Sequence, residues 1–133
     1  MDSNSLSRKG FERWLDFNLK AEISLSRILP ASTGVYVIKN DTLFGRFVGE
    51  SDIVYIGSAA GENGLRGRIS QFFSPGPAQG GNKRINEILH SHPGLKISFV
   101  HSPSAADAEA LESSLLKEYD RQHRDLPPGL WKK

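Results

Sequence analysis

The sequence predicts a single α/β domain of the α+β type, and three observations support that fold class. The chain has 133 residues, of which 38% are hydrophobic, so it can bury one core. Apolar residues recur at helical spacing in four stretches, and three short runs are rich in β-branched residues. Glycine and proline clusters separate these segments. We therefore expect the order helix, strand, strand, helix, helix, strand, helix.

The first thirty residues are expected to form a helical extension (1–30) packed on a main domain of residues 31–133. The apolar residues of this extension recur at helical spacing, and they are Phe11, Trp14, Leu15, Leu19, Ile23 and Leu25. Pro30 ends the run. The helix is expected to cover the core, with partner docking or dimerisation as the alternative. Charged residues interrupt the stretch, which argues against a signal peptide or a membrane span and favours a cytoplasmic location.

Two β-rich runs follow the extension, over residues 35–38 and 53–56. Turn residues bound both runs, which predicts the two strands of one hairpin. Residues 43–48 are expected to extend this hairpin as a longer arm. Helical spacing then resumes over residues 65–73, and this helix is expected to end before Pro75, because proline disrupts a helix interior.

The remaining third of the chain predicts a helix, a strand and a final helix. Asn82 is expected to cap the first of these, which stops before Pro93. Apolar and polar residues alternate over 95–99, which is typical of a half-buried strand. The last helix is expected to begin near Ser104, because Asp107 lies three residues on and completes a variant of the capping box.

The middle of the chain is basic. Residues 63–101 hold five Lys and Arg against one acidic residue, although the whole chain carries a net charge of only +2. Such a stretch attracts polyanions through counterion release, and a solvated surface is the alternative. The chain contains no cysteine, which excludes disulfides, thiolate zinc sites and cysteine nucleophiles. Any metal ion must therefore bind through carboxylate, imidazole or water.

Glu112 occupies an unusual position on the last predicted helix. The residues three or four positions away are mostly apolar, among them Leu115 and Leu116. A lone carboxylate in such surroundings needs a compensating cation, either a metal ion or an arginine. Arg68 lies at the edge of the buried stripe of its own short helix, and a guanidinium can fork two hydrogen bonds onto a phosphate. A structural ion pair between Arg68 and Glu112 is the alternative.

Tyr36 and Tyr55 lie one in each strand of the predicted hairpin. Phenols on the same face of adjacent antiparallel strands can reach one site, although tyrosine in a strand more often serves simple sheet packing. With an ordinary pKa near 10, a phenol is only about 0.1% ionised at pH 7. A catalytic role for either tyrosine therefore requires a cation beside it.

Four short motifs lie in a fixed order on the predicted strands and helices. They are Gly34-Val35-Tyr36, Tyr55-Ile56-Gly57, Leu65-Arg66-Gly67-Arg68-Ile69 and Leu111-Glu112-Ser113-Ser114-Leu115-Leu116. In this order they resemble the GIY-YIG nuclease family, and the similarity runs from Gly34 to about Gly129. The resemblance implies a small domain with a three-stranded antiparallel sheet flanked by helices. It also implies cleavage of DNA phosphodiester bonds with one divalent metal ion.

The resemblance assigns a role to each of four residues. Glu112 would hold the Mg²⁺ or Mn²⁺ ion, and Arg68 would bind the scissile phosphate. Tyr55 would orient or deprotonate the attacking water, assisted by Tyr36. These roles agree with the chemistry of the residues, because phosphoryl transfer gathers negative charge that a metal ion and a guanidinium stabilise. Substrate binding is expected at Gly57, Ser58, Arg66, Lys83 and Arg84.

Three positions depart from the pattern of many relatives. Ser58 stands where a lysine often follows the second motif, and Phe72 stands where a tyrosine or histidine often follows the arginine. The usual asparagine after the glutamate helix is absent from the sequence. A hydroxyl from Ser58 and the charge of Lys83 or Arg84 are expected to take over phosphate binding.

The predicted protein is a stand-alone endonuclease acting on DNA, with RNA as the alternative substrate. A domain of this size has limited contact area, so a homodimer or a partner protein is expected to supply specificity. The competing hypothesis is a catalytically weak or inactive nucleic-acid-binding module of the same fold. A third hypothesis is an adaptor that binds proteins through its basic surface.

Two other kinds of site are not supported. The glycine-rich segment 57–64 lacks the lysine and hydroxyl that complete a nucleotide phosphate loop. His90 and His92 fall at a predicted helix end with no cysteine beside them, so they are expected at the surface rather than in a metal cluster.

Overall fold

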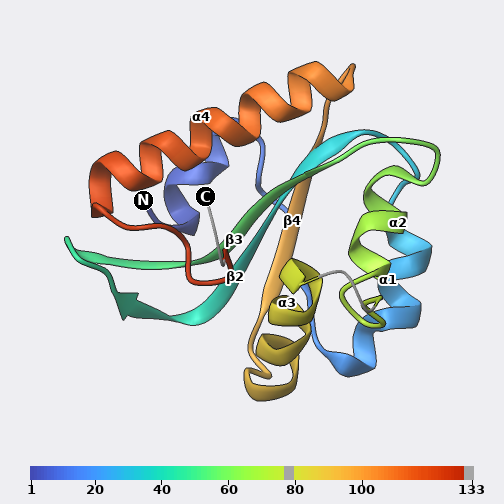
Figure 1. Cartoon of the computed structure of the whole chain (residues 1–133), viewed down its shortest axis with the longest axis horizontal. Coiled ribbons are helices and arrows are strands. Elements are labelled where there is room, and N and C mark those ends of the chain that lie inside the picture. The colour runs from blue at the N-terminus through green and yellow to red at the C-terminus, as the bar shows by residue number, and fades with distance from the viewer. Residues whose placement is uncertain (77–79, 131–133) are drawn as a thin grey trace.

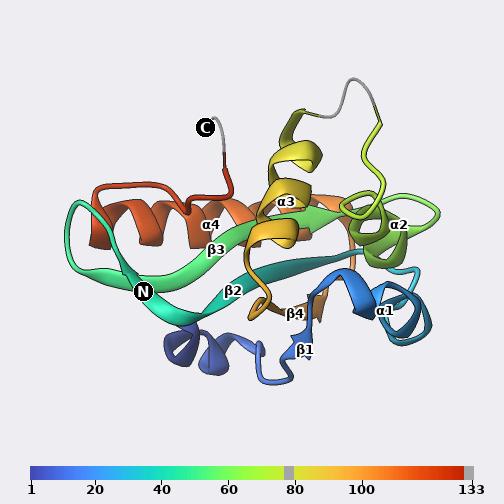
Figure 2. The ribbon, with the colours of Figure 1, turned by 90° about the horizontal axis from the view of Figure 1, so that it is seen from below.

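The centre of the molecule is an antiparallel sheet (Figure 1). The computed structural model describes residues 1–76 and 80–130, and these residues form four strands. The strands are β1 (Leu15–Asp16), β2 (Gly34–Gly45), β3 (Glu50–Ala59) and β4 (Lys96–His101). Their order across the sheet is β1-β4-β2-β3, so β3 is an edge strand (Figure 2). The predicted α+β class is confirmed, with one more strand than the three expected.

Helices cover both faces of the sheet (Figures 1 and 2). The 3-10 helix η1 (Ser3–Lys9) and the long helix α4 (Ala105–His123) share one face, where they pack against the alternate residues Val35 and Val37 of β2. The other face, which carries Tyr36 and Ile38, is covered by η2 (Leu19–Ala21), α1 (Glu22–Ile28), α2 (Gly64–Ser70) and α3 (Gly80–Ser91). None of the helices within the described residues is long and apolar enough to cross a membrane.

The N-terminal segment does not form the single helix that its apolar spacing predicts. Gly10, with φ of 97°, ends η1, and β1 then pairs with β4 along the sheet. Phe11 is buried in the core beneath α4, whereas Phe17 is buried in the core on the opposite face. One helix presents one apolar stripe, so it could not deliver these two rings to different faces. After β1 the chain turns helical again, over η2 and α1. The division into an extension and a main domain stays a prediction.

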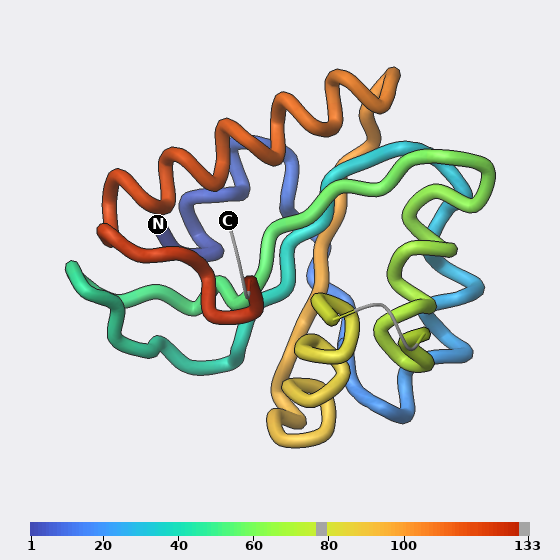
Figure 3. The backbone as a smooth tube through the Cα atoms, viewed as in Figure 1, coloured from blue at the N-terminus to red at the C-terminus, as the bar shows by residue number. Residues whose placement is uncertain are grey.

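The hairpin of β2 and β3 carries the predicted long arm (Figure 3). At its turn the amide of Arg46 donates to the carbonyl of Gly49 at 2.9 Å. The turn also lies against the end of α4, where two hydrogen bonds join Val48 to His123. The Val48 amide donates to the His123 carbonyl at 2.9 Å, and His123 Nδ1 donates to the Val48 carbonyl at 2.8 Å. Arg46 forms a 2.9 Å ion pair with Asp125. These contacts fix the arm to the C-terminal part of the chain.

A β-bulge interrupts the pairing of β2 and β3 near the middle of the hairpin. Ile38 pairs with Tyr55 and Lys39 with Ile53, which leaves Val54 without a partner across the ladder. An extra residue shifts the alternation of side chains by one. Val54 and Tyr55 consequently both belong to the core on the face of α1, α2 and α3, although they are adjacent in the chain.

The start of α4 is fixed as the sequence predicts. Ser104 adopts an extended backbone, and its hydroxyl accepts a hydrogen bond from the Asp107 amide at 3.1 Å. The same hydroxyl donates to the Asp107 carboxylate at 3.0 Å. These bonds satisfy one of the amides that the first turn of a helix leaves without an intrahelical partner.

Replacing this cap should destabilise the protein. We expect Ser104→Ala to lower the free energy of unfolding by about 1 kcal/mol, the usual loss when a serine cap is removed. Urea unfolding followed by circular dichroism measures the change. Ser114→Ala is the matched control, because Ser114 is exposed in the interior of the same helix and alanine is the better helix former there. Equal unfolding midpoints for the two variants would show that the cap contributes nothing.

Candidate active site

Three aromatic rings form the centre of the candidate site. Tyr36 and Tyr55 stack with their ring centroids 5.9 Å apart and an interplanar angle of 24°. The Phe72 ring lies edge-on to both, at 5.9 Å from Tyr36 and 6.0 Å from Tyr55. Tyr36 is fully buried, whereas Tyr55 is half-buried. Of the two phenols, Tyr55 is therefore the one that solvent can reach, and the predicted proximity of the tyrosines is confirmed.

Gly57 lets the Tyr36 phenol approach strand β3. The two residues pair directly across the β2–β3 ladder. A Cβ atom on Gly57 would lie 2.5 Å from the Tyr36 hydroxyl oxygen and 2.8 Å from Cε1 of Tyr55. Both distances are shorter than van der Waals contact allows, so any side chain at this position would displace the two rings. The glycine of the Tyr-Ile-Gly motif is thus a steric requirement of the tyrosine pair.

The Tyr36 hydroxyl is fully buried beside the side chains of Tyr55 and Arg68, the two polar neighbours that influence its ionisation. Burial raises the pKa of Tyr36 well above its ordinary value, and the neighbouring Tyr55 adds to this effect while Arg68 opposes it. The phenol therefore stays protonated at neutral pH. A protonated phenol beside Arg68 can donate a hydrogen bond to an anion that the guanidinium binds.

Arg68 is held beside the tyrosines by neutral side chains. Its Nη1 donates to Gln71 Oε1 at 3.0 Å and to Asn82 Oδ1 at 2.7 Å, and its Cζ lies 5.3 Å from the centroid of the Phe72 ring. Asn82 is only 3% exposed and belongs to the first turn of α3, so the prediction that it caps that helix is wrong. Its side chain orients Arg68 instead.

No acidic side chain neutralises Arg68 among the residues that the structure describes. Burial lowers the pKa of the guanidinium, but the nearby Tyr36 and Tyr55 more than offset this, so the net pKa lies above the ordinary value. The alternative of a structural ion pair with Glu112 is therefore not supported. Arg68 is a fixed positive charge whose hydrogen-bond partners are uncharged.

Glu112 approaches the same edge of the sheet from the opposite face. It is half-buried on α4, and its Oε1 accepts a 2.6 Å hydrogen bond from the hydroxyl of Ser58, the residue after Gly57 on the edge strand. Ser58 and Arg68 line one hollow of about 460 Å³. Glu112 itself lines a different hollow of about 540 Å³. The structure thus brings Tyr36, Tyr55 and Arg68 into one cluster and connects Glu112 to it through Ser58.

The other predicted binding residues lie in several places. Arg66 Nε donates to the Leu29 carbonyl at 2.8 Å, which ties α2 to the end of α1. Arg84 Nε donates to the Pro128 carbonyl at 2.9 Å and lines a separate cavity described below. Lys83 is exposed on α3. Of the five residues predicted to bind substrate, Gly57 and Ser58 adjoin the cluster.

Two residues of the site were missed by the sequence reasoning. Gln71 lies three residues after Arg68, and that spacing on a helix would have indicated a partner. Asn82 comes from a different helix, and no local pattern marks it as a neighbour of Arg68. Its role follows only from the tertiary structure, in which side chains of α3 hydrogen-bond to residues at the end of α2.

Comparison with known proteins supports the fold. No family model and no curated protein matches the sequence. Among solved structures, the chain is similar to the GIY-YIG N-terminal endonuclease domain of UvrC from Thermotoga maritima bound to magnesium, its catalytic divalent cation. That likeness has 20% sequence identity and a TM-score of 0.54, and it covers 84% of this chain and 97% of that one. A point mutant of the same domain, bound to its catalytic divalent cation, gives 20% identity, a TM-score of 0.55, and coverage of 85% and 98%. At this identity the likeness establishes the fold, and the chain has the GIY-YIG fold that its motifs predict.

A methyl group at Gly57 should disturb the tyrosine pair. We expect Gly57→Ala to lower the free energy of unfolding by about 1–3 kcal/mol, as overpacking of a filled core does. Urea unfolding tests this. Gly45→Ala provides the matched control, because a Cβ on that glycine of β2 would meet no atom within 4 Å. If the two variants unfold at the same urea concentration, the close approach of Gly57 and Tyr36 is incorrect.

The buried Tyr36 phenol should make stability fall at alkaline pH. Its pKa is raised in the folded state, so its contribution is complete below about pH 10, the value in the unfolded chain, and is lost as pH rises beyond it. We expect Tyr36→Phe to unfold within about 1 kcal/mol of wild type at pH 7 and to gain on wild type between pH 9 and 11. Urea unfolding over that pH range measures both. A large loss at pH 7 with an unchanged pH profile would show that the hydroxyl has a structural partner.

Proposed function

We propose that this chain is a metal-dependent endonuclease that hydrolyses DNA phosphodiester bonds. The observation that carries the proposal is the setting of Arg68, whose charge lies against two tyrosines and is oriented by the uncharged Gln71 and Asn82. A phosphate group is the natural partner of such a guanidinium, because two of its oxygens accept parallel hydrogen bonds in the plane of the fork. The GIY-YIG fold supports the same reaction class, since its solved neighbours are endonuclease domains.

The exposure of each side chain in the cluster indicates the role that we propose for it. Arg68 would bind the nonbridging oxygens of the scissile phosphate and stabilise the charge that builds on them. Tyr55, the half-buried phenol, would orient or deprotonate the attacking water. Tyr36 stays protonated and buried, so it would position the Tyr55 ring and donate a hydrogen bond, rather than act as a base.

Glu112 is the residue that would hold Mg²⁺ or Mn²⁺. Its carboxylate is half-buried and forms no ion pair within the described ranges 1–76 and 80–130, so it has capacity for a cation. Those ranges also contain no cluster of three or more acidic or histidine ligands. Magnesium suits this sparse donor set, because it commonly binds one or two carboxylates and completes its shell with water and substrate phosphate. When bound, the ion would polarise the phosphate and favour ionisation of water.

A second candidate function is nucleic-acid binding without turnover. Ser58 favours it, because its hydroxyl occupies one oxygen of Glu112 at 2.6 Å instead of adding the positive charge found at this position in many relatives. Phe72 likewise contributes a ring without a hydroxyl to the centre of the cluster. Under either function the chain would bind DNA or RNA. A cytoplasmic location remains a prediction. The homodimer or partner protein that would supply specificity also remains a prediction.

Cleavage assays on single-stranded, duplex and branched DNA with Mg²⁺ or Mn²⁺ separate the two functions. We expect Arg68→Gln and Glu112→Gln each to lower the cleavage rate roughly 10²- to 10³-fold, the loss typical of one group that stabilises a transition state. Glu118→Gln is the matched control for Glu112, since Glu118 lies on the same helix and faces Lys9 at 3.9 Å. Its cleavage rate should equal that of wild type.

The outcomes distinguish the hypotheses clearly. Cutting by wild type that survives both active-site substitutions would rule out the proposed roles. DNA binding with no cutting under any metal condition would favour the binding module. No salt-dependent affinity for DNA at all would exclude both and leave the protein-binding adaptor.

A further inference from the structure

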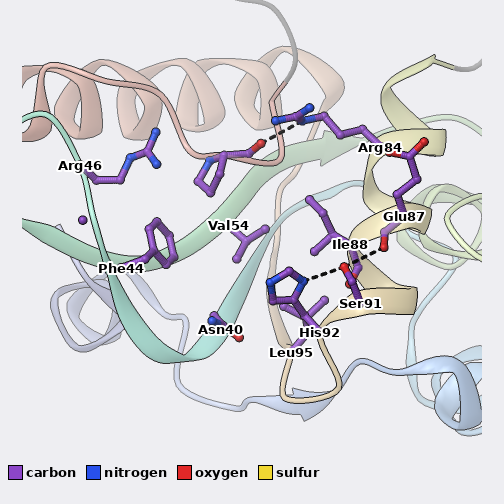
Figure 4. A pocket seen from close by; sticks show the side chains of 12 residues that line it. Asn40, Phe44, Arg46, Val54, Arg84, Glu87, Ile88, Ser91, His92 and Leu95 are labelled. Carbon is purple, nitrogen blue, oxygen red and sulfur yellow. Dashed lines mark hydrogen bonds between the residues drawn. The ribbon is translucent and has the colours of Figure 1, made fainter.

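A second cavity lies on the same sheet face as the tyrosine cluster, beyond the bulge in β3. Its volume is about 500 Å³, within the usual range for small-molecule sites. Figure 4 shows the cavity between the arm of β2 on one side and α3 on the other. The segment that follows α4 borders it at Pro128. None of the functions discussed above uses this cavity.

The cavity combines an aromatic wall with an apolar floor. The Phe44 ring projects from the arm of β2, and Val54, Ile88 and Leu95 also line the cavity (Figure 4). Arg46 Cζ lies 5.6 Å from the centroid of the Phe44 ring. An aromatic ring exposed in a cavity of this kind offers a surface on which a flat heterocycle can stack.

Polar groups converge on the same space from α3. Arg84, Glu87, Ser91 and His92 line the cavity opposite Phe44 (Figure 4). Asp125 neutralises Arg46 through an ion pair of 2.9 Å. Arg84 forms no ion pair with any described residue, and its Nε donates a hydrogen bond to the Pro128 carbonyl. Arg84 therefore keeps its terminal nitrogens for an anion, with Glu87, three residues further along α3, as an opposing charge in the same lining. The carboxylate of Glu87 can accept a hydrogen bond from the polar edge of a ring, whereas the Ser91 hydroxyl already bonds the Glu87 carbonyl at 3.0 Å and His92 Nδ1 at 2.9 Å.

The bulge connects this cavity to the candidate active site. Val54 lines the cavity, while the next residue, Tyr55, belongs to the tyrosine cluster, and the bulge places both on one face. Gly129 lies between them, since its amide donates to the Val54 carbonyl at 2.7 Å and a Cβ on it would come within 3.2 Å of Tyr55 Cβ. The cavity and the cluster are thus neighbouring sites along strand β3.

We propose that this cavity binds one unpaired nucleotide of the DNA strand that is cut. The base would stack on Phe44, its phosphate would pair with Arg84, and the Glu87 carboxylate would accept a hydrogen bond from the edge of the base. A base inside a duplex cannot enter, because its two faces are covered by stacking and its edge by pairing. The inference rests on the proposed endonuclease function, and it specifies the substrate as DNA with an unpaired nucleotide next to the scissile phosphate.

Binding is tested without hydrolysis. The Glu112→Gln protein is titrated with pentathymidylate in the absence of divalent metal, and backbone amide resonances are followed by NMR. We expect saturable shifts at Phe44, Val54 and Ser91. Phe44→Leu in this background, which keeps an apolar side chain but removes the ring, should weaken binding roughly tenfold, as loss of one stacked base does. Phe47→Leu makes the same change at an 83% exposed position outside the cavity, and it should leave affinity unchanged.

The phosphate contact has its own measurement. Arg84→Gln should reduce the slope of log affinity against log salt by about 0.7, the value for one phosphate of a single strand. Arg8→Gln, an equal change of charge at an exposed position on η1 across the sheet, should leave the slope unaltered. Arg84→Gln also keeps the inference testable if Phe44→Leu fails to fold, which the NMR spectrum would reveal.

The source of the nucleotide is decided by a second ligand. Thymidine monophosphate should shift the same amides much more weakly than the pentamer. Equal affinity for the two would identify a free-nucleotide site and overturn the strand assignment. No shift at cavity residues with either ligand, or equal effects of Phe44→Leu and Phe47→Leu, would overturn the inference itself. Because these assays need no cutting, they stand even if the chain proves to have no nuclease activity.

Discussion

The close approach of Tyr36 to Gly57 is the contact on which the rest of the site depends. It occurs at the edge of the sheet, where the Tyr36 phenol on β2 lies against Gly57 on β3. A side chain at Gly57 would occupy the place of the phenolic oxygen, so the approach exists only with glycine at this position. Once Tyr36 is placed, Tyr55 stacks on it and Phe72 closes the cluster from α2. The positions of three rings therefore follow from one missing Cβ atom.

The edge position of β3 also explains how residues from both faces meet. Side chains alternate across a strand, so Gly57 and Ser58 face opposite layers of helices. Arg68 approaches from the layer of α2, where α3 contributes Asn82 to orient it. Glu112 approaches from α4 and bonds Ser58. In the middle of the sheet the neighbouring strands would separate these groups, but past an edge strand they can serve one substrate.

Strand β3 also contains the β-bulge at Val54, next to the tyrosine cluster. The bulge at Val54 turns two successive side chains to one face, so the tyrosine cluster and the cavity beside Phe44 lie next to each other along β3. Bulges often re-aim side chains beside active sites. Here the bulge, the contact of Gly129 with β3 and the arm of the hairpin all border the cavity next to the cluster.

The sequence by itself determined the elements whose signals are local. The strand pair, the cap at Ser104 and the helix before Pro75 all follow from short-range spacing, since turns, caps and periodicity act over a few residues. The grouping of Tyr36, Tyr55 and Arg68 was implied by the order of the motifs and their resemblance to the GIY-YIG family. Tertiary structure alone decided the rest. Phe11 and Phe17 lie in different cores, Asn82 serves Arg68 rather than a helix start, and Glu112 reaches the site only through Ser58. Each of these depends on which face of the sheet an element packs against, and residues distant in the chain set that choice.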